Sequence, residues 1–458
     1  MKKQESSKRS TFSGKFGYVM AAAGSAVGLG NIWRFPYLAA KYGGGLFLLF
    51  YLIFAVTIGY TLIISESALG RMTGKSPVGA FSKFGNSPLY KASGWINAIV
   101  PMLIAPYYCV IGGWVMKYCF EYFRGSVHIL ADDAYFSGFI SNSASVELWF
   151  LFFAAITLLV VIAGVTKGVE RVSKIVMPLL ILIAILIAGY SITRENALEG
   201  VKYMLIPNFK NFSFMTVVAA MGQVFYSLSI GMGILYTYGS YLKKDVDIEK
   251  STNQVIGFDT AIAILSGLMI IPAVFAFAGG SPETLNAGPA LMFITLPKVF
   301  ESLGFGSIGG IFFFVLVFFA ALTSSISLVE TSVSTFQDEL HLSRKKSCTI
   351  MGVITILLGT ASALGFGVWD CIQIPHVGTI LDLFDFLTNS IMMPICATAT
   401  TFLIIKVVGT KKIEKEVLIS SKFKFKGMYN VFIRYFIPIC LILVLFSSIA
   451  NVFGWIHI

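Results

Sequence analysis

At positions 24–37 the chain reads GSAVGLGNIWRFPY. Three closely spaced glycines, an asparagine and an arginine here interrupt an apolar segment that begins near Phe16. Glycine weakens a helix interior by about 1 kcal/mol relative to alanine, and a broken helix in hydrocarbon leaves backbone polar groups that only a cavity or neighbouring protein can satisfy. Close packing of small residues against another helix would explain the glycines alone. The asparagine and the arginine favour a discontinuous membrane helix whose freed carbonyls and helix end bind ions.

The composition is that of a polytopic membrane protein. Of the 458 residues, 56% are hydrophobic and 12% are charged, whereas soluble chains carry about 25% charged residues. The six cysteines show neither metal-ligand spacing nor a disulfide pattern. The net charge of +11 comes from basic residues in short loops, so the positive-inside rule explains it better than nucleic-acid binding does.

Eleven apolar runs reach the roughly 20 residues that a membrane-spanning helix needs. We therefore predict an all-α polytopic membrane protein with eleven transmembrane helices in a single transmembrane domain, 1–458. Lysine and arginine gather in the N-terminal tail and in alternate loops, which predicts a cytoplasmic N-terminus and a C-terminus outside. The runs lie at 16–38, 44–70, 95–122, 147–164, 172–192, 214–241, 255–278, 308–337, 347–366, 383–407 and 430–453.

The sixth run repeats the theme of the first. From 222 to 241 it reads GQVFYSLSIGMGILYTYGSY, with two serines and two glycines interrupting its middle. Paired discontinuous segments at matching places point to an inverted repeat with a binding site at the bilayer midplane. Among the few other polar residues inside apolar runs is Glu66, which we expect to cap the freed amides of a broken helix rather than to touch a ligand.

The first run resembles the first transmembrane segment of the neurotransmitter:sodium symporter family, in its bacterial amino-acid transporter branch. FFAALTSSIS at 318–327 also matches the family pattern closely, and the resemblance extends from Arg9 to the end of the chain. It implies two inverted five-helix repeats with discontinuous helices 1 and 6. The first repeat would occupy 1–192 with an N-terminal cytoplasmic tail, the second 214–407, and an additional helix 430–453. The family's usual twelfth span has no counterpart here, as in some bacterial members.

The resemblance implies two sodium sites, built from the oxygen ligands that a hard cation prefers. In isolation, serines and threonines in a membrane helix are more often packing groups. In the first site the substrate's own carboxylate would complete the ligand set and so couple sodium binding to substrate binding. Sodium would be a co-transported ligand, and no cofactor is expected. The first site comprises Ala26, Asn31, Ser227 and Asp259; the second comprises Gly24, Val27, Ala320, Thr323 and Ser324.

Asp259 carries a further expectation. A related bacterial transporter has asparagine at the matching position and glutamate one turn later, where this chain has Ala263. Chloride-dependent members of the family lack a fixed negative charge in this neighbourhood and bind chloride instead. We therefore predict that Asp259 supplies the charge and that transport needs no chloride. The alternative is that Asp259 is a sodium ligand with no such role.

The substrate class follows from one absence. Monoamine transporters of the family carry an aspartate that meets the amine, and the aligned residue here is Gly28. The resemblance then implies that the carboxylate of an α-amino acid fills this space, beside sodium and the hydroxyl of Tyr108. Met232 suits a promiscuous apolar pocket because methionine is unbranched and adaptable, ordinary core packing being the alternative. We predict hydrophobic or aromatic amino acids as substrates. The implied pocket comprises Ala26, Gly28, Gly30, Ile104, Tyr108, Tyr226, Ser227, Ser229, Met232, Ser327 and Leu328.

The resemblance also implies gates on both sides of this site. Arg34 and Asp385 would pair on the outer side, and Arg9 would pair with Asp338 near Tyr241 on the inner side. Exposed ion pairs contribute only about 0–1 kcal/mol, which suits contacts that must open.

Two details concern the inner side. Phe12 replaces the tryptophan that is usual near the family's inner gate. Gly168 and Pro178 have the Gly-x9-Pro spacing that in the family accompanies local unwinding at the inner end of the fifth span. A simple proline kink is an equally good interpretation.

We predict a sodium-coupled symporter that brings hydrophobic or aromatic α-amino acids into the cell by alternating access. Its partners would be the amino acid, sodium and the lipid bilayer of a bacterial cytoplasmic membrane, with homo-oligomerisation left open and no nucleic acid. A nontransporting amino-acid sensor of the same fold is the alternative. A channel would need a continuous polar pore, and an enzyme would need a nucleophile–base pair or a metal-ligand cluster, which the sequence does not offer.

Overall fold

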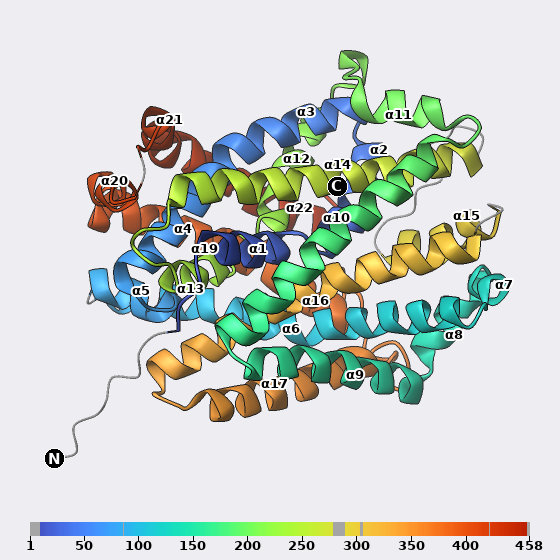
Figure 1. The fold of residues 1–458 in the computed structure, drawn as a ribbon, viewed down its shortest axis with the longest axis horizontal. Coiled ribbons are helices and arrows are strands. Elements are labelled where there is room, and N and C mark those ends of the chain that lie inside the picture. Colours follow the sequence, from blue (N-terminus) through green and yellow to red (C-terminus); the bar gives the residue numbers. More distant parts are fainter. Residues whose placement is uncertain (1–9, 86, 278–288, 303–305, 421, 456–458) are drawn as a thin grey trace.

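The computed structural model describes residues 10–85, 87–277, 289–302, 306–420 and 422–455. Within these ranges the chain is helical and holds only two isolated β-bridges, so the predicted all-α class is confirmed for this part of the chain. Most of the long helices run roughly lengthwise through the molecule (Figure 1).

Nine helical stretches among the described residues are long and apolar enough to cross a membrane. They coincide with nine of the eleven predicted runs. Their bounds are Gly45–Thr73 (α3 Gly45–Phe54, η2 Ala55–Gly59, α4 Tyr60–Thr73), α6 Pro88–Phe123, α9 Ser143–Ile162, Val165–Ile192 (η3 Val165–Glu170, α10 Arg171–Ile192), α14 Ile248–Phe277, α16 Gly306–Glu339, α17 Arg344–Leu364, Ile380–Val408 (α18 Ile380–Asp385, η7 Phe386–Met392, α19 Met393–Leu403, η8 Ile404–Val408) and Lys426–Val452 (α21 Lys426–Val431, η9 Phe432–Phe436, α22 Ile437–Val452).

The two remaining runs are broken, as their sequences predict. The first consists of α1 (Lys15–Ala26), η1 (Gly30–Arg34) and α2 (Phe35–Lys41). The sixth consists of α12 (Phe214–Ser227) and α13 (Ile234–Ser240). None of these pieces alone reaches the length of about 20 residues that a span requires.

Shorter elements connect the long ones. They are α5 Pro77–Phe84, α7 Val127–Leu130, α8 Asp133–Ser141, α11 Ala197–Leu205, η4 Phe209–Asn211, η6 Leu291–Thr295, α15 Leu296–Ser302 and α20 Thr410–Leu418. Their boundaries follow local chemistry. The Ser87 side chain caps α6 by accepting from the amide of Leu89, and Thr379 and Asp382 form a reciprocal capping box at α18.

Burial divides the long helices into core and periphery. Helices α6 and α16 are largely buried, whereas α9 and α22 present apolar side chains such as Leu159, Ile442 and Phe446 on the outside. Exposed apolar side chains in such numbers are typical of a surface that lipid covers. The broken first segment lies against the buried helices, because α1 packs between α10, α14 and α16. The weak points are therefore held inside protein.

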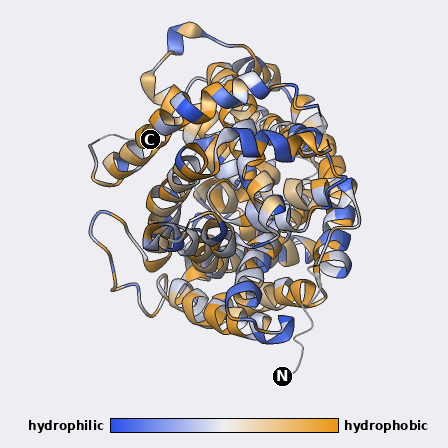
Figure 2. Cartoon of the chain, turned by 90° about the vertical axis from the view of Figure 1, so that its left-hand side faces the viewer, coloured by the Kyte–Doolittle hydropathy of each residue, from blue (hydrophilic) through white to orange (hydrophobic). Residues whose placement is uncertain are grey.

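The lysine-rich connections meet at one end of the bundle, which we call the basic end. It includes the turns around α5, the segment between α13 and α14, the α16–α17 turn and α20, all at the left in Figure 1. Figure 2 looks onto this end, where hydrophilic turns lie among the hydrophobic helices.

Candidate ion and substrate site

The breaks in the two discontinuous segments meet at the centre of the molecule. In the sixth segment Ser229, Gly231 and Gly233 adopt positive φ angles of 54°, 74° and 70°, which end helix α12 and start α13. The freed amide of Gly231 donates to Glu66 Oε1 at 3.1 Å, so the predicted capping role of Glu66 is confirmed. A side chain on Gly231 would also lie 2.6 Å from the carbonyl of Met393. Glycine is therefore required there for both conformation and space.

In the first segment the chain turns out of the helix at Val27, whose ψ is 96°. The amide of Gly28 then donates to Asn31 Oδ1 at 3.2 Å, so the asparagine after the glycines caps the break. The carbonyl of Gly30 accepts from Gln223 Nε2 at 2.9 Å. Side chains from the first and sixth segments thus satisfy groups that the break exposes.

A cavity lies between the two breaks and helices α6 and α16. Its wall includes every residue of the predicted substrate pocket except Ser327, and it is mostly apolar. The lining residues are Ser25, Ala26, Gly28, Leu29, Gly30, Asn31, Ile104, Tyr108, Tyr226, Ser227, Ser229, Met232, Ile234, Ser324, Leu328 and Asn389.

Ser327 is the one residue of the predicted pocket that does not line this cavity. Helix α16 turns Ser324 and Leu328, one turn apart, toward the cavity. The Ser327 hydroxyl therefore points to another face, where it accepts from Tyr238 OH at 2.7 Å and donates to the carbonyl of Thr323 at 3.0 Å.

Two glycines keep the cavity open. A Cβ atom on Gly28 would lie 2.8 Å from Ser324 Oγ and 2.9 Å from the hydroxyl of Tyr108. A Cβ atom on Gly30 would lie 2.4 Å from the ring of Tyr226. Any side chain at these positions would displace groups of the cavity wall.

Asn31, Ser227 and Asp259 of the first predicted sodium set form one buried hydrogen-bonded cluster. Asn31 Nδ2 donates to Ser227 Oγ at 3.0 Å and to Asp259 Oδ1 at 2.8 Å. The Ser227 hydroxyl donates to the same carboxylate oxygen at 2.6 Å. The other oxygen, Oδ2, accepts from Tyr51 OH at 2.6 Å. Ala26, the fourth predicted member, lines the adjoining cavity.

The second predicted sodium set is also brought together. The Ser324 hydroxyl lies 3.4 Å from the carbonyl oxygen of Gly24 and 3.3 Å from that of Val27. On the same helix, Thr323 Oγ1 lies 3.2 Å from the carbonyl oxygen of Ala320. Ser324 and the carbonyls of Gly24 and Val27 thus meet where α1 ends against α16, while Thr323 and Ala320 are neighbours along α16. Among the described residues no group of three His, Cys, Asp or Glu side chains could hold a metal ion.

The outer pair of the prediction is not formed directly. Arg34 lies over the ring of Tyr226, 5.0 Å from its centroid. Asp385 instead accepts from Asn389 Nδ2 at 2.6 Å and from Tyr107 OH at 3.3 Å. These nearer donors satisfy the carboxylate, so within the described part of the chain no ion pair joins it to the guanidinium.

At the basic end, Arg9 lies outside the described residues. Its predicted partner Asp338 accepts from the amide of Ser76 at 2.7 Å and lies 4.0 Å from Lys75 Nζ. The Tyr241 hydroxyl donates to Glu330 Oε1 at 2.8 Å, and Glu330 pairs with Arg344. Sequence reasoning missed this pair, although Glu330 is a buried glutamate inside an apolar span and was a visible signal.

Phe12 seals the same end. Its side chain is 2% exposed and packs edge-on against Tyr18, Tyr238 and Tyr241 at 5.5–5.9 Å between ring centroids. The tail is held by a second contact, because the amide of Ser13 donates to Glu170 Oε2 at 2.9 Å. The phenylalanine thus occupies a tight aromatic cluster at the basic end.

The N-terminal end of the fifth span is wound in this structure. Residues Val165–Glu170 form the π-helical turn η3, and Gly168 donates to the carbonyl of Gly164 at 2.9 Å. Pro178 lies within the following helix α10. The predicted unwinding is therefore not seen here; the π turn is the irregularity that this stretch shows instead.

Sequence reasoning also missed Tyr51 and Gln223, which hold Asp259 and the carbonyl of Gly30. A tyrosine and a glutamine within apolar runs were the available signals. Their partners, however, lie 208 and 193 positions away along the chain, so only the packing of the helices connects them.

Comparison with known proteins agrees with this architecture. The sequence profile described as the sodium:neurotransmitter symporter family matches residues 9–128 and 121–455. An uncharacterised sodium-dependent transporter of Bacillus subtilis, YhdH, is 36% identical over 441 residues, covering 95% of this chain and 97% of its own. One from Haemophilus influenzae is 32% identical, with coverages of 96% and 98%. The crystal structure of MhsT in complex with L-phenylalanine superposes with a TM-score of 0.86 at 37% identity, covering 96% of this chain and 100% of that chain.

These matches span almost the entire chain and agree with one another. They show that the protein is a sodium-coupled membrane transporter, not an enzyme, and that sodium is a co-transported ion. The chain belongs to the sodium:neurotransmitter symporter family.

Proposed function

We propose that the protein couples inward sodium flow to the uptake of hydrophobic or aromatic α-amino acids, without a requirement for chloride. The observation that carries the proposal is the cavity between the two broken segments, with a buried oxygen cluster adjoining it on each side. The similar structure of MhsT is a complex with L-phenylalanine, which supports an aromatic substrate.

The cavity's chemistry is matched to a zwitterion with an apolar side chain. Its polar groups lie at the breaks, where Tyr108 OH accepts from the amide of Leu29 at 3.2 Å and the Asn31 side chain reaches the wall. A substrate carboxylate would lie there, next to sodium at Ala26, Asn31, Ser227 and Asp259. The ammonium group would meet carbonyl oxygens of the unwound segments, which carry partial negative charge.

The apolar part of the wall favours a large side chain. Ile104, Met232 and Leu328 line the cavity and offer no hydrogen-bonding side chain. An apolar substrate group would gain from burial there, whereas a polar one would be left without partners. Methionine can adapt to different shapes, which favours a pocket that accepts several large amino acids.

Alternating access supplies the transport step. The second sodium site, at Gly24, Val27, Ala320, Thr323 and Ser324, joins α1 to α16. A cation held there would stabilise the arrangement in which the first segment rests on α16. Loss of that cation toward the basic end would release α1, and with it the contacts of Phe12.

The membrane arrangement belongs to the same proposal. It has eleven spans, a first repeat at 1–192, a second at 214–407 and an additional helix at 430–453. The basic end would face the cytoplasm of a bacterial cell, since basic loops stay on that side, and the C-terminus would be outside.

The decisive experiment is counterflow in proteoliposomes. Proteoliposomes containing the purified protein would be loaded with unlabelled phenylalanine, leucine, alanine or glutamate. Labelled phenylalanine would then be added outside, in a buffer that contains either sodium or potassium and either chloride or gluconate. The proposal requires exchange for phenylalanine and leucine only, dependent on sodium and indifferent to chloride. Sodium-dependent binding of phenylalanine without exchange would instead support the sensor of the same fold.

A further inference from the structure

The connection between the Ile380–Val408 and Lys426–Val452 spans is an element that the transport cycle leaves unexplained. It contains α20 (Thr410–Leu418) and the loop leading to α21. Because one span ends directly before it and the next begins directly after it, this element must lie at the membrane surface at the basic end (Figure 1).

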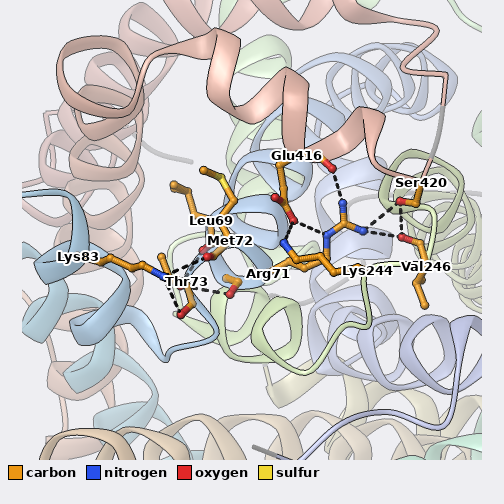
Figure 3. Close-up of polar contacts among 10 residues, drawn as sticks. Leu69, Arg71, Met72, Thr73, Lys83, Lys244, Val246, Glu416 and Ser420 are labelled. Carbon is orange, nitrogen blue, oxygen red and sulfur yellow. Dashed lines mark hydrogen bonds and ion pairs between the residues drawn. The ribbon is translucent and has the colours of Figure 1, made fainter.

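The inner face of α20 is firmly attached to the transporter. Arg71 of α4 is fully buried; its Nε donates to Glu416 Oε1 at 2.8 Å and its Nη1 to the carbonyl of Val246 at 2.7 Å. Lys244 Nζ reaches the same glutamate oxygen at 2.6 Å (Figure 3). Ser420 Oγ donates to the Val246 carbonyl at 2.7 Å. One network therefore ties α20 to α4 and to the segment that follows α13.

Both glutamates of α20 are paired with basic residues. Glu416 is neutralised by Arg71 and Lys244. Glu414 is turned toward Lys426 Nζ, 2.8 Å away, and accepts from Asn430 Nδ2 at 2.8 Å. Both glutamates are buried. The outward face of the connection is consequently positive.

The outward face is also partly apolar. Among the described residues, no ion pair engages its exposed lysines, and between and beside them Leu418, Ile419 and Phe425 are 49%, 54% and 52% exposed. Orientation in the membrane requires the positive charges, but it gives no reason for exposed apolar side chains among them. We name this set the α20 surface: Lys411, Lys412, Lys415, Leu418, Ile419, Lys422, Lys424 and Phe425.

We infer that the α20 surface binds anionic phospholipid headgroups, with its three apolar side chains inserted at the level of the acyl chains. Clusters of four to eight lysines or arginines directly beside a membrane helix attract anionic lipids, and large apolar side chains next to them add burial that a soluble anion could not supply. A second copy of the chain is a poorer occupant, because a symmetric contact would oppose lysines to lysines. Through Arg71 and Lys244, lipid bound outside would stabilise the closed arrangement of α4 and the segment after α13.

The test compares lipids in detergent solution. Full-length protein would be titrated with dioleoyl phosphatidylglycerol, with dioleoyl phosphatidylcholine and with water-soluble glycerophosphoglycerol, while native mass spectrometry counts bound lipid and a thermal shift reports stability. The α20-surface variant replaces Lys411, Lys412, Lys415 and Lys424 by glutamine. The matched control replaces four exposed lysines elsewhere at the basic end, Lys91, Lys167, Lys345 and Lys346, by glutamine.

We expect phosphatidylglycerol to bind and stabilise the wild type and the control equally, and the α20-surface variant to bind it about tenfold more weakly or worse. A second variant, Ile419→Ser with Phe425→Ser, keeps all charges and should also lose affinity, and the soluble headgroup should have no effect. Equal binding by both lysine variants, or an equal effect of phosphatidylcholine, would overturn the inference. Full stabilisation by glycerophosphoglycerol would show that the α20 surface binds soluble phosphates and does not need the lipid chains. If the α20-surface variant fails to fold, the double variant Lys411→Gln with Lys412→Gln and the serine variant test the same inference.

Discussion

At the scale of single residues, the site depends on a few buried groups whose neighbours leave no freedom. Asp259 is fully buried and accepts from Asn31, Ser227 and Tyr51. Three donors around one carboxylate are what a buried charge needs. These three donors hold the carboxylate in place next to Asn31 and Ser227, which line the cavity.

Replacing Asp259 by asparagine should make transport depend on chloride. The variant keeps the shape of the side chain but removes the fixed charge, which an anion would then have to supply. Uptake of labelled phenylalanine would be measured with chloride and with gluconate outside. A variant that transports equally well in gluconate would contradict the role that we assign to Asp259.

Gly28→Ala should weaken substrate binding. The added Cβ would lie 2.8 Å from Ser324 Oγ and 2.9 Å from the Tyr108 hydroxyl, which overfills the space proposed for the substrate carboxylate. We expect at least about a tenfold loss of phenylalanine affinity, in line with the 1–3 kcal/mol of typical overpacking. Gly222→Ala is the matched control, since an added Cβ there meets nothing within 4 Å, and it should bind normally. Unchanged binding by Gly28→Ala would show that the substrate carboxylate does not lie at this position.

At the scale of elements, the structure is organised by two breaks and by the groups that cap them. The side chain of Asn31 caps the first, and Glu66 caps the second. Both breaks are buried, so every freed backbone group must find a protein partner or a ligand.

Glu66→Leu should destabilise the sixth segment and weaken substrate binding. It leaves the buried amide of Gly231 without an acceptor, which typically costs about 1–3 kcal/mol. Glu66→Gln keeps an oxygen at the same place and should retain most of the melting temperature and the phenylalanine affinity. Equal behaviour of the two variants would show that the hydrogen bond to Gly231 is not the reason for the glutamate.

The docking of α20 should weaken at low pH. Burial would raise the pKa of the Glu414 carboxyl, but hydrogen bonds from Lys426 and Asn430 outweigh it and hold this pKa below its usual value. A lowered folded-state pKa gives stability that is present above the unfolded value of about 4.3 and is lost as the pH falls through the folded value. Melting temperatures between pH 7 and pH 3.5 should fall less steeply for Glu414→Gln than for the wild type. Parallel curves would mean that this carboxyl adds nothing.

At the scale of the whole molecule, the basic end is closed by the tail and by aromatic packing. Phe12 lies among Tyr18, Tyr238 and Tyr241, and Ser13 is bound to Glu170. These contacts join α1, α13 and the fifth span. They must separate together if the site is to open toward this end.

Phe12→Ala should shift the population toward the inward-open state. Truncating a buried phenylalanine typically costs about 3–5 kcal/mol. Here the loss would destabilise the closed arrangement, in which Phe12 is buried. Apparent affinity for sodium should fall, because the binding-competent state is less populated, and hydrogen exchange in residues 236–241 should accelerate. Phe16→Ala, four positions on and 58% exposed, should change neither. If both variants exchange alike, Phe12 is not part of the closure.

Much of this arrangement follows from local sequence. Apolar runs interrupted by glycine, serine and asparagine predict spans and their breaks, because helix stability and membrane length depend on neighbouring residues along the chain. The runs FFAALTSSIS and GSAVGLGNIW likewise carry groups that the fold brings together around the cavity. These features need no knowledge of how the helices pack.

Other features depend on which helix face meets which neighbour, and only the tertiary structure decides that. In the tertiary structure Ser327 bonds to Tyr238 and does not reach the cavity. Asp385 accepts from Asn389 and Tyr107 and does not pair with Arg34, and Tyr51 donates to Asp259. A rotation of one residue moves a side chain by about 100° around a helix. Except for Asn389 and Asp385, these partners also lie between 89 and 278 positions apart in sequence. Local patterns thus fix what each segment is, while long-range packing fixes which atoms it touches.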